Sequence, residues 1–115
     1  MKESKKVILI KDDKLGSGDL GAMMIGGFLG AVGAQADLLP KSVVLLNRGV
    51  LLGAKEAENS GALEALKALE SQGVEVLFCQ TCVEFFALDG KLGVGKVSNA
   101  MEISRLLLSH EVLSL

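Results

Sequence analysis

The sequence contains no tryptophan and no tyrosine, and its four phenylalanines give an aromatic fraction of only 3%. Proteins that bind single-stranded nucleic acid stack bases on aromatic side chains, so this class is disfavoured. An excess of positive charge is also missing, because the formal net charge is −2 and the pI is near 5.4. A basic phosphate-binding surface is therefore not expected, and we predict no nucleic-acid partner.

Cysteine is scarce, with two residues in a chain of 115. A small secreted domain held together by disulfides would carry more cysteines in a shorter chain. The apolar run at residues 7–10 follows a charged N-terminus, but it is too short for the core of a signal peptide. We therefore predict a cytoplasmic protein.

Long hydrophobic runs are absent except for one uncharged segment, residues 20–36. Its length of 17 residues is at the lower limit for a membrane-spanning helix. Five glycines dilute its hydrophobicity, and Asp19 and Asp37 flank it without basic or aromatic residues. The segment therefore predicts a buried helix, and we expect no association with a membrane.

The composition that remains is that of a folded domain, with 50% hydrophobic and 23% charged residues. These fractions exclude intrinsic disorder, and the length fits one domain with its own core. The mean hydropathy of +0.45 is high for so short a chain. It indicates more apolar surface than a monomer would hide, so we predict a homo-oligomer.

Short apolar runs alternate with segments that have helical periodicity. The runs, each expected to form a strand, are residues 7–10, 42–46, 74–78, 94–97 and 112–115. Helices are expected at residues 19–36, 50–57, 59–73, 81–88 and 99–109, with Asp19 capping the first. This alternation predicts an α/β fold with a parallel sheet between helices.

In parallel sheets the functional residues collect beyond the carboxyl ends of the strands. This rule points to the loops at residues 12–19, 47–53 and 79–81. Asp12 and Asp13 in the first loop are able to bind a cation or polarise a ligand, although such acidic residues are more often simply solvated.

The most informative motif is the Cys-Gln-Thr-Cys sequence formed by residues 79–82, directly after a predicted strand. Thr81 and Glu84 have the spacing of a capping box, which predicts a helix that begins at Thr81. A helix N-terminus favours negative charge, so the thiols of Cys79 and Cys82 are expected to have lowered pKa values. The two thiols would then be close enough to exchange sulfur. The alternative is that they pack as small hydrophobic side chains.

Two further motifs indicate a function less strongly than the cysteine pair does. A structural zinc ion needs four ligands, and the chain offers two cysteines and His110, so we predict no metal.

Residues 16–21 fit the G-x-G-x-x-G pattern of dinucleotide-binding proteins. The acidic residue expected after the second strand is missing, because Asn47 and Arg48 stand there. We therefore predict no cofactor, and nucleotide binding by this loop is kept as an alternative.

The chain resembles the DsrE-like domain of the YedF group of sulfurtransferase-like proteins, a group linked by name to selenium metabolism. The resemblance covers about residues 6–105. It rests on V-I-L-I-K-D-D at 7–13, G-S-G-D-L-G at 16–21, L-P-K-S-V-V-L-L-N-R-G-V at 39–50, E-V-L-F-C-Q-T-C at 75–82 and V-G-K-V-S-N at 94–99.

This resemblance implies a three-layer α/β/α fold with a mostly parallel five-stranded sheet, and assembly into homo-oligomers. In the wider family, a cysteine at the position of Cys79 carries sulfur as a persulfide, and the YedF-like group shares a second cysteine at the position of Cys82. The implied partners are sulfur donor and acceptor proteins of the TusA-like or cysteine desulfurase type. YedF-like proteins usually add an N-terminal TusA-like domain. We expect residues 1–115 to form a single DsrE-like domain without it.

Two principal hypotheses follow. In the first, the protein is a sulfurtransferase-like carrier that accepts sulfur or selenium on Cys79, with Cys82 as the resolving thiol. In the second, it is a non-catalytic oligomeric module that docks a TusA-like partner, and the cysteines only pack.

Overall fold

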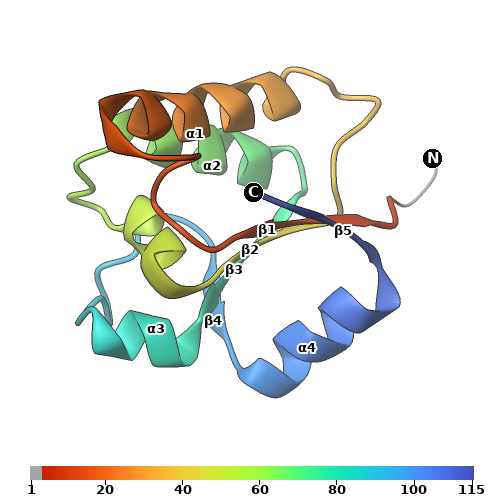
Figure 1. Cartoon of the computed structure of the whole chain (residues 1–115). Coiled ribbons are helices and arrows are strands. Elements are labelled where there is room, and N and C mark those ends of the chain that lie inside the picture. Colours follow the sequence, from red (N-terminus) through yellow and green to blue (C-terminus); the bar gives the residue numbers. More distant parts are fainter. Residues whose placement is uncertain (1–3) are drawn as a thin grey trace.

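The computed structural model describes residues 4–115, so the first three residues of the charged N-terminus lie outside the described range. A five-stranded sheet forms the middle layer, with α1 and α2 on one face and α3 and α4 on the other (Figure 1). The strands are β1 (Lys6–Ile10), β2 (Ser42–Leu45), β3 (Glu75–Cys79), β4 (Lys96–Ser98) and β5 (Glu111–Ser114). The helices are α1 (Gly18–Gly33), α2 (Ser60–Ser71), α3 (Gln80–Phe85) and α4 (Ala100–Ser109), with a 3₁₀ helix η1 (Asn47–Gly53) after β2.

All four strand pairings in the sheet are parallel, and the strand order is β4-β3-β2-β1-β5. The predicted α/β fold with a five-stranded parallel sheet is confirmed. Each predicted strand is present, displaced by one or two residues at its ends. The carboxyl ends of β1, β2 and β3 therefore meet at one edge, where the loops selected from the sequence lie together.

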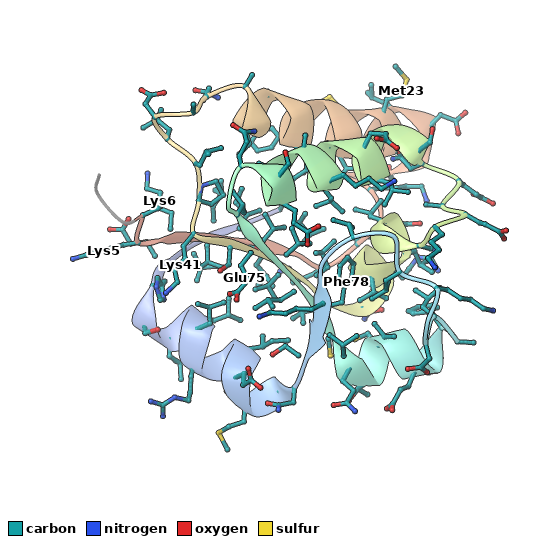
Figure 2. The ribbon with its side chains drawn as sticks, turned by 180° about the vertical axis from the view of Figure 1, so that it is seen from behind. Lys5, Lys6, Met23, Lys41, Glu75 and Phe78 are labelled. Carbon is teal, nitrogen blue, oxygen red and sulfur yellow. The ribbon has the colours of Figure 1, made fainter. Side chains whose placement is uncertain are left out.

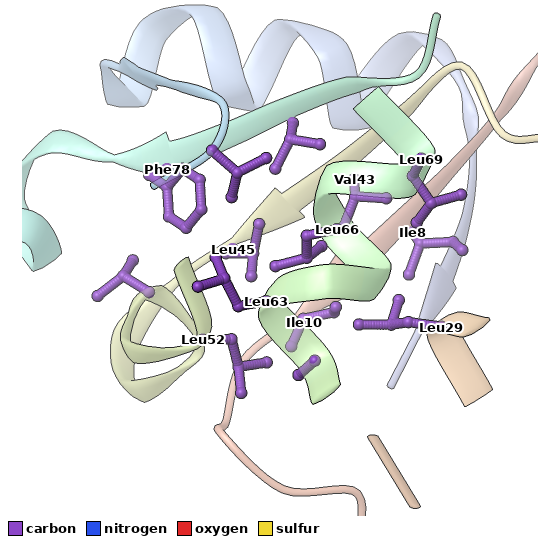
Figure 3. Close-up of a cluster of buried hydrophobic side chains, with 14 of the residues drawn as sticks. Ile8, Ile10, Leu29, Val43, Leu45, Leu52, Leu63, Leu66, Leu69 and Phe78 are labelled. Carbon is purple, nitrogen blue, oxygen red and sulfur yellow. The ribbon is translucent and has the colours of Figure 1, made fainter. Parts of the chain in front are cut away.

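The core is divided by the sheet, because successive residues of a strand point to opposite faces. The larger cluster lies between the sheet and helices α1 and α2, and includes Ile10, Leu66 and Phe78 (Figure 3). A smaller cluster lies on the face covered by α4. It consists of the buried residues Val7, Val44, Leu77 and Ile103. Residues 76 and 78 of β3 thus face the larger cluster, whereas residues 77 and 79 face the smaller one.

Helix α1 corrects two predictions. It begins at Gly18 after the N-cap residue Ser17, so Asp19 is not its cap but lies inside its first turn. The helix also ends at Gly33, three residues earlier than expected, and polar turns follow. Its last turn lacks charged residues, so local sequence gave no signal for its end.

The same helix is also less buried than predicted. Its inner face buries Gly21, Ile25 and Leu29 at a spacing of four residues. The opposite face is exposed, and Met23 projects outward with 73% of its surface accessible (Figure 2). Among the described residues, no helix is long and apolar enough to cross a membrane.

The segment at residues 50–57 was expected to form a helix, and the structure instead has η1 at residues 47–53. Two glycines explain this tight turn. A Cβ atom on Gly49 would lie 2.6 Å from the carbonyl oxygen of Ile10, and one on Gly53 would collide with the ring of Phe78. Glycine is therefore required for η1 to pack directly on the ends of β1 and β3.

Candidate functional site

Cys79 is the last residue of β3 and immediately precedes α3. Its backbone is still extended, so its side chain continues the alternation of the strand. The side chain is half-buried and packs against the smaller core cluster on the α4 face. The structure thus places this thiol at the carboxyl edge of the sheet, with part of its surface open.

Cys82 lies in the first turn of α3 and packs against the larger cluster. Its Sγ accepts a hydrogen bond from the backbone N–H of Asn47, with 3.0 Å between nitrogen and sulfur. Asn47 has a φ of 50°, a left-handed conformation that asparagine adopts more readily than most residues other than glycine. The start of η1 is thereby fixed beside the cysteine pair.

The thiol of Cys82 does not have the lowered pKa expected from a helix N-terminus. Burial raises its pKa, and the adjacent Cys79 raises it further through a hydrogen bond and through its charge. The N–H of Asn47 acts in the opposite direction, but it is the weaker influence. Cys79 is the N-cap residue of α3 and Cys82 lies in its first turn, so the motif places both cysteines at the start of the same helix.

The predicted capping box is wrong as well. Helix α3 begins at Gln80, with Cys79 as its N-cap residue, and the side chain of Cys79 makes no capping hydrogen bond. Thr81 therefore lies inside the helix rather than before it. The helix has only six residues.

Ser98 is a neighbour of the site that the sequence reasoning missed. It is the last residue of β4, and the parallel register pairs it directly with Cys79. Its side chain is 7% exposed, and its Oγ has no hydrogen-bond partner within the described chain. The V-G-K-V-S-N run was noted as part of the family resemblance. The pairing of Ser98 with Cys79, however, depends on the register between β3 and β4, which the sequence alone does not predict.

Arg48 links the first two loops at the same edge. Its guanidinium group donates hydrogen bonds to both carboxylate oxygens of Asp13, at 3.4 and 3.1 Å, and lies 3.7 Å from Asp12. Partial burial acts to raise the pKa of Asp13, but the hydrogen bonds from Arg48 and the positive charges of Arg48 and Lys14 lower it. Asp13 is thus held as a carboxylate, and its role is to fix the loop.

A cleft of about 1100 Å³ opens beside this ion pair. It lies between the first turns of α1, η1 and the turn at Gly90, and neither cysteine lines it. Its charged lining consists of Lys14, Arg48, Lys55 and Lys91 with Asp13, Asp19, Glu56 and Glu58. The charged lining is therefore balanced between the two signs.

The glycine-rich loop borders this cleft. Gly16 and Gly18 have positive φ values, and a Cβ atom on Gly21 would lie 3.0 Å from the carbonyl oxygen of Leu15. These glycines are explained by the turn that leads into α1. A phosphate group at this position would meet the carboxylates of Asp13 and Asp19, which argues against the nucleotide alternative.

His110 lies away from the cysteines, at the end of α4. Its Nδ1 is 2.9 Å from the carbonyl oxygen of Leu106, as expected for a histidine at a helix C-terminus. No group of three or more His, Cys, Asp or Glu residues within residues 4–115 is arranged to hold a metal ion.

Comparison with known proteins places this geometry in a family. The sequence profile of the DsrE/DsrF-like family matches residues 21–114. The chain belongs to the DsrE/DsrF-like family. Members of this family are generally sulfur-relay proteins, which accords with two thiols at the functional edge of the sheet.

The fold is also similar to that of a solved structure, the YchN protein from E. coli. The TM-score is 0.73 at 21% sequence identity, and the match covers 97% of this chain and 99% of that chain. This likeness supports the DsrE/DsrF-like fold. A search of curated protein sequences gave no match.

Proposed function

We propose that the protein carries sulfur as a persulfide on Cys79. In the loading step, the Cys79 thiolate attacks the outer sulfur of a donor persulfide, R–S–SH. The S–S bond of the donor breaks, R–S⁻ leaves, and the outer sulfur with its proton is now bound to Cys79 as Cys79–S–SH. The observation that carries this proposal is the pair of adjacent, partly open thiols at the carboxyl edge of a sulfur-relay fold.

The two thiols have different roles because their environments differ. The thiolate is the attacking form of a cysteine, and the raised pKa of Cys82 keeps that thiol protonated at neutral pH. Cys82 is therefore a poor first acceptor, and Cys79 is assigned that role. Cys79 is also the residue at the end of the strand, where a donor can approach.

Cys82 acts as the resolving thiol. Its thiolate attacks the inner sulfur of the protonated persulfide, Cys79–S–SH, which forms a Cys79–Cys82 disulfide and releases the outer sulfur with its proton as HS⁻. A reducing thiol must then open this disulfide before the next cycle. The competing step is transfer, in which an acceptor thiolate takes the outer sulfur and returns Cys79 as a thiolate. The raised pKa of Cys82 slows the first step and so favours transfer.

Donor and acceptor proteins of the TusA-like or cysteine desulfurase type would dock around the cysteine pair. Exposed apolar side chains belong to the elements that flank it. Phe85 on α3 is 81% exposed, and Met101 stands in the first turn of α4 with most of its surface accessible. Such side chains are suited to a transient protein contact. Selenium would use the same thiolate chemistry.

Cyanolysis tests this proposal, because cyanide removes the outer sulfur of a persulfide as thiocyanate. After exposure to inorganic polysulfide and removal of the excess, the wild-type protein and Cys82→Ser are expected to release about one thiocyanate per chain. Cys79→Ser is the matched variant and is expected to release none. Equal release from Cys79→Ser would overturn the assignment of the carrier.

The alternative function, an oligomeric module that docks a TusA-like partner, has one observation in its favour. The outer face of α1 presents uncharged side chains over most of its length, including Leu20, Met23, Met24 and Phe28. In this alternative the thiols would resist alkylation in the folded protein and react after denaturation. Rapid alkylation of folded Cys79 would instead favour the carrier.

A further inference from the structure

The strand pairing aligns Ser98 with Cys79 at the carboxyl edge of the sheet. The two residues are register partners on β3 and β4, and partners in a sheet project their side chains to the same face. Neighbouring strands are about 4.8 Å apart. The hydroxyl of Ser98 and the thiol of Cys79 therefore leave adjacent strands on the same side.

The hydroxyl of Ser98 lacks the partner that a buried polar group normally has. Its Oγ is inaccessible to solvent, and no atom of residues 4–115, the Cys79 sulfur included, is placed to form a hydrogen bond with it. Buried hydroxyl groups are satisfied in most folded proteins, so an unsatisfied one calls for an explanation. An alanine would fill the same place without this cost, yet the chain has serine.

We propose that the Ser98 hydroxyl donates a hydrogen bond to the outer sulfur of a persulfide on Cys79. This inference rests on the proposed carrier function and adds a second residue to its site. Loading lengthens the Cys79 side chain by one S–S bond of about 2.05 Å. The added sulfur is an acceptor that is missing from the unloaded protein, and it leaves Cys79 on the face that Ser98 occupies.

The chemistry of the loaded state favours this contact. A persulfide is more acidic than a thiol, so its outer sulfur is negatively charged at neutral pH. Hydrogen bonds to an ionised acceptor are stronger than those between neutral groups. The hydroxyl would hold the outer sulfur as an anion. A negatively charged sulfur repels an attacking thiolate, so loss of the sulfur to thiols in solution is delayed. Ser98 thus retains the carried sulfur.

The test uses Cys82→Ser as the background, so that the resolving thiol cannot remove the sulfur. Ser98→Ala and Ser98→Thr are compared with Ser98 in this background, each loaded with inorganic polysulfide. Intact mass follows the loss of sulfur with time, and alkylation across pH follows ionisation of the persulfide. For Ser98→Ala we expect sulfur to be lost about tenfold faster and the persulfide pKa to rise by about one unit. Ser98→Thr keeps the hydroxyl and is expected to behave like serine.

The proposal also makes two predictions for the unloaded protein, and these separate it from a purely structural role of Ser98. Because the hydroxyl is unsatisfied in the unloaded protein, Ser98→Ala should leave the unfolding midpoint unchanged or raise it, and the alkylation rate of unloaded Cys79 should not change. If Ser98→Ala retains sulfur as long as serine does, the inference is wrong while the carrier function stands. If the Cys82→Ser parent, which keeps Ser98, takes up no sulfur, the carrier function fails and this inference fails with it. Should Ser98→Thr not fold, the alanine comparison still decides.

Discussion

At the level of single residues, the protonation of Cys82 would decide what happens to a sulfur carried in the way we propose. Burial and the adjacent Cys79 raise the pKa of Cys82, and the Asn47 N–H offsets only part of this effect. The thiol is therefore protonated at neutral pH, and in the proposed mechanism it would rarely attack the persulfide. A carrier needs this delay, because rapid formation of the disulfide would discard the sulfur as sulfide.

A pH dependence follows from this raised pKa. The loaded wild-type protein is expected to release sulfide slowly at neutral pH and faster as the pH rises through and above the ordinary thiol value of 9.0. The reason is that the attacking thiolate of Cys82 forms only there. Sulfide release measured across pH checks this, with Cys82→Ser as the control that should show no such rise. Release that reaches its maximum below the ordinary value would contradict the account.

The two cysteines could be predicted as site residues from the sequence, but the residues that surround them could not. Cys79 and Cys82 were identified from a local pattern after a strand. Asn47 and Ser98 reach them from other strands, and contacts of that kind depend on parallel register and on an unusual backbone angle. The lowered pKa expected for Cys82 was wrong because a helix start is visible in sequence, whereas burial of the thiol is not.

At the scale of elements, η1 holds the site together. It begins with Asn47 against Cys82, continues with Arg48 against Asp13, and ends with Gly53 against Phe78. One short turn thus contacts the loop that follows β1 as well as β3 and the start of α3. Its form was mispredicted because residues 50–57 have the apolar character of a helix, while the close contact of Gly49 and Gly53 with distant strands determines the geometry.

The contact between Gly53 and Phe78 leads to a stability prediction. Gly53→Ala is expected to destabilise the protein by about 1–3 kcal/mol, because the added methyl group would collide with a fully buried ring. Urea unfolding measures this change. Gly27→Ala is the matched control, since nothing lies within 4 Å of its Cβ position on exposed helix α1. It should stabilise by about 0.5–1 kcal/mol. Equal effects of both variants would show that η1 is not tightly packed.

The ion pair between Arg48 and Asp13 should contribute in a pH-dependent way. The pKa of Asp13 is lowered in the folded state from its ordinary value of 3.8. Its stabilising contribution is therefore present above that value and is lost as the pH falls through the lowered pKa. Arg48→Met should reduce stability slightly at neutral pH, by less at high salt, and not at all once Asp13 is protonated. Urea unfolding across the acid range checks this. A loss that persists at the lowest pH would assign Arg48 a packing role instead.

At the scale of the whole molecule, the fold separates two surfaces. The cysteines lie at the carboxyl edge of the sheet, whereas the exposed uncharged face of α1 lies on the outside of the other layer (Figure 1). The fold class was predictable because strands and helices alternate regularly along the chain. The exposed α1 face was not predictable, because residues 20–33 carry no charge and so indicate a buried helix. The structure shows that only the side with Gly21, Ile25 and Leu29 faces the core.

The α1 face leads to a prediction about assembly. If it joins copies of this chain, replacing Leu20 and Met24 with lysine should shift the protein toward monomers, because charge would be placed in an apolar contact. Sedimentation velocity measures the shift. Leu108→Lys on α4 is the control, as this exposed leucine lies on the other side of the sheet. An unchanged assembly in the α1 variant would place the interface elsewhere.

The most direct measurement of the central claim is the intact mass of three proteins after exposure to a persulfide donor. We expect the wild type and Cys82→Ser each to gain one sulfur atom and Cys79→Ser to gain none. It also predicts that the wild type later loses this sulfur as its thiols form a disulfide, while Cys82→Ser retains it. Sulfur uptake by Cys79→Ser, or no uptake by any form with both thiols inert until denaturation, would contradict the claim that Cys79 is a sulfur carrier.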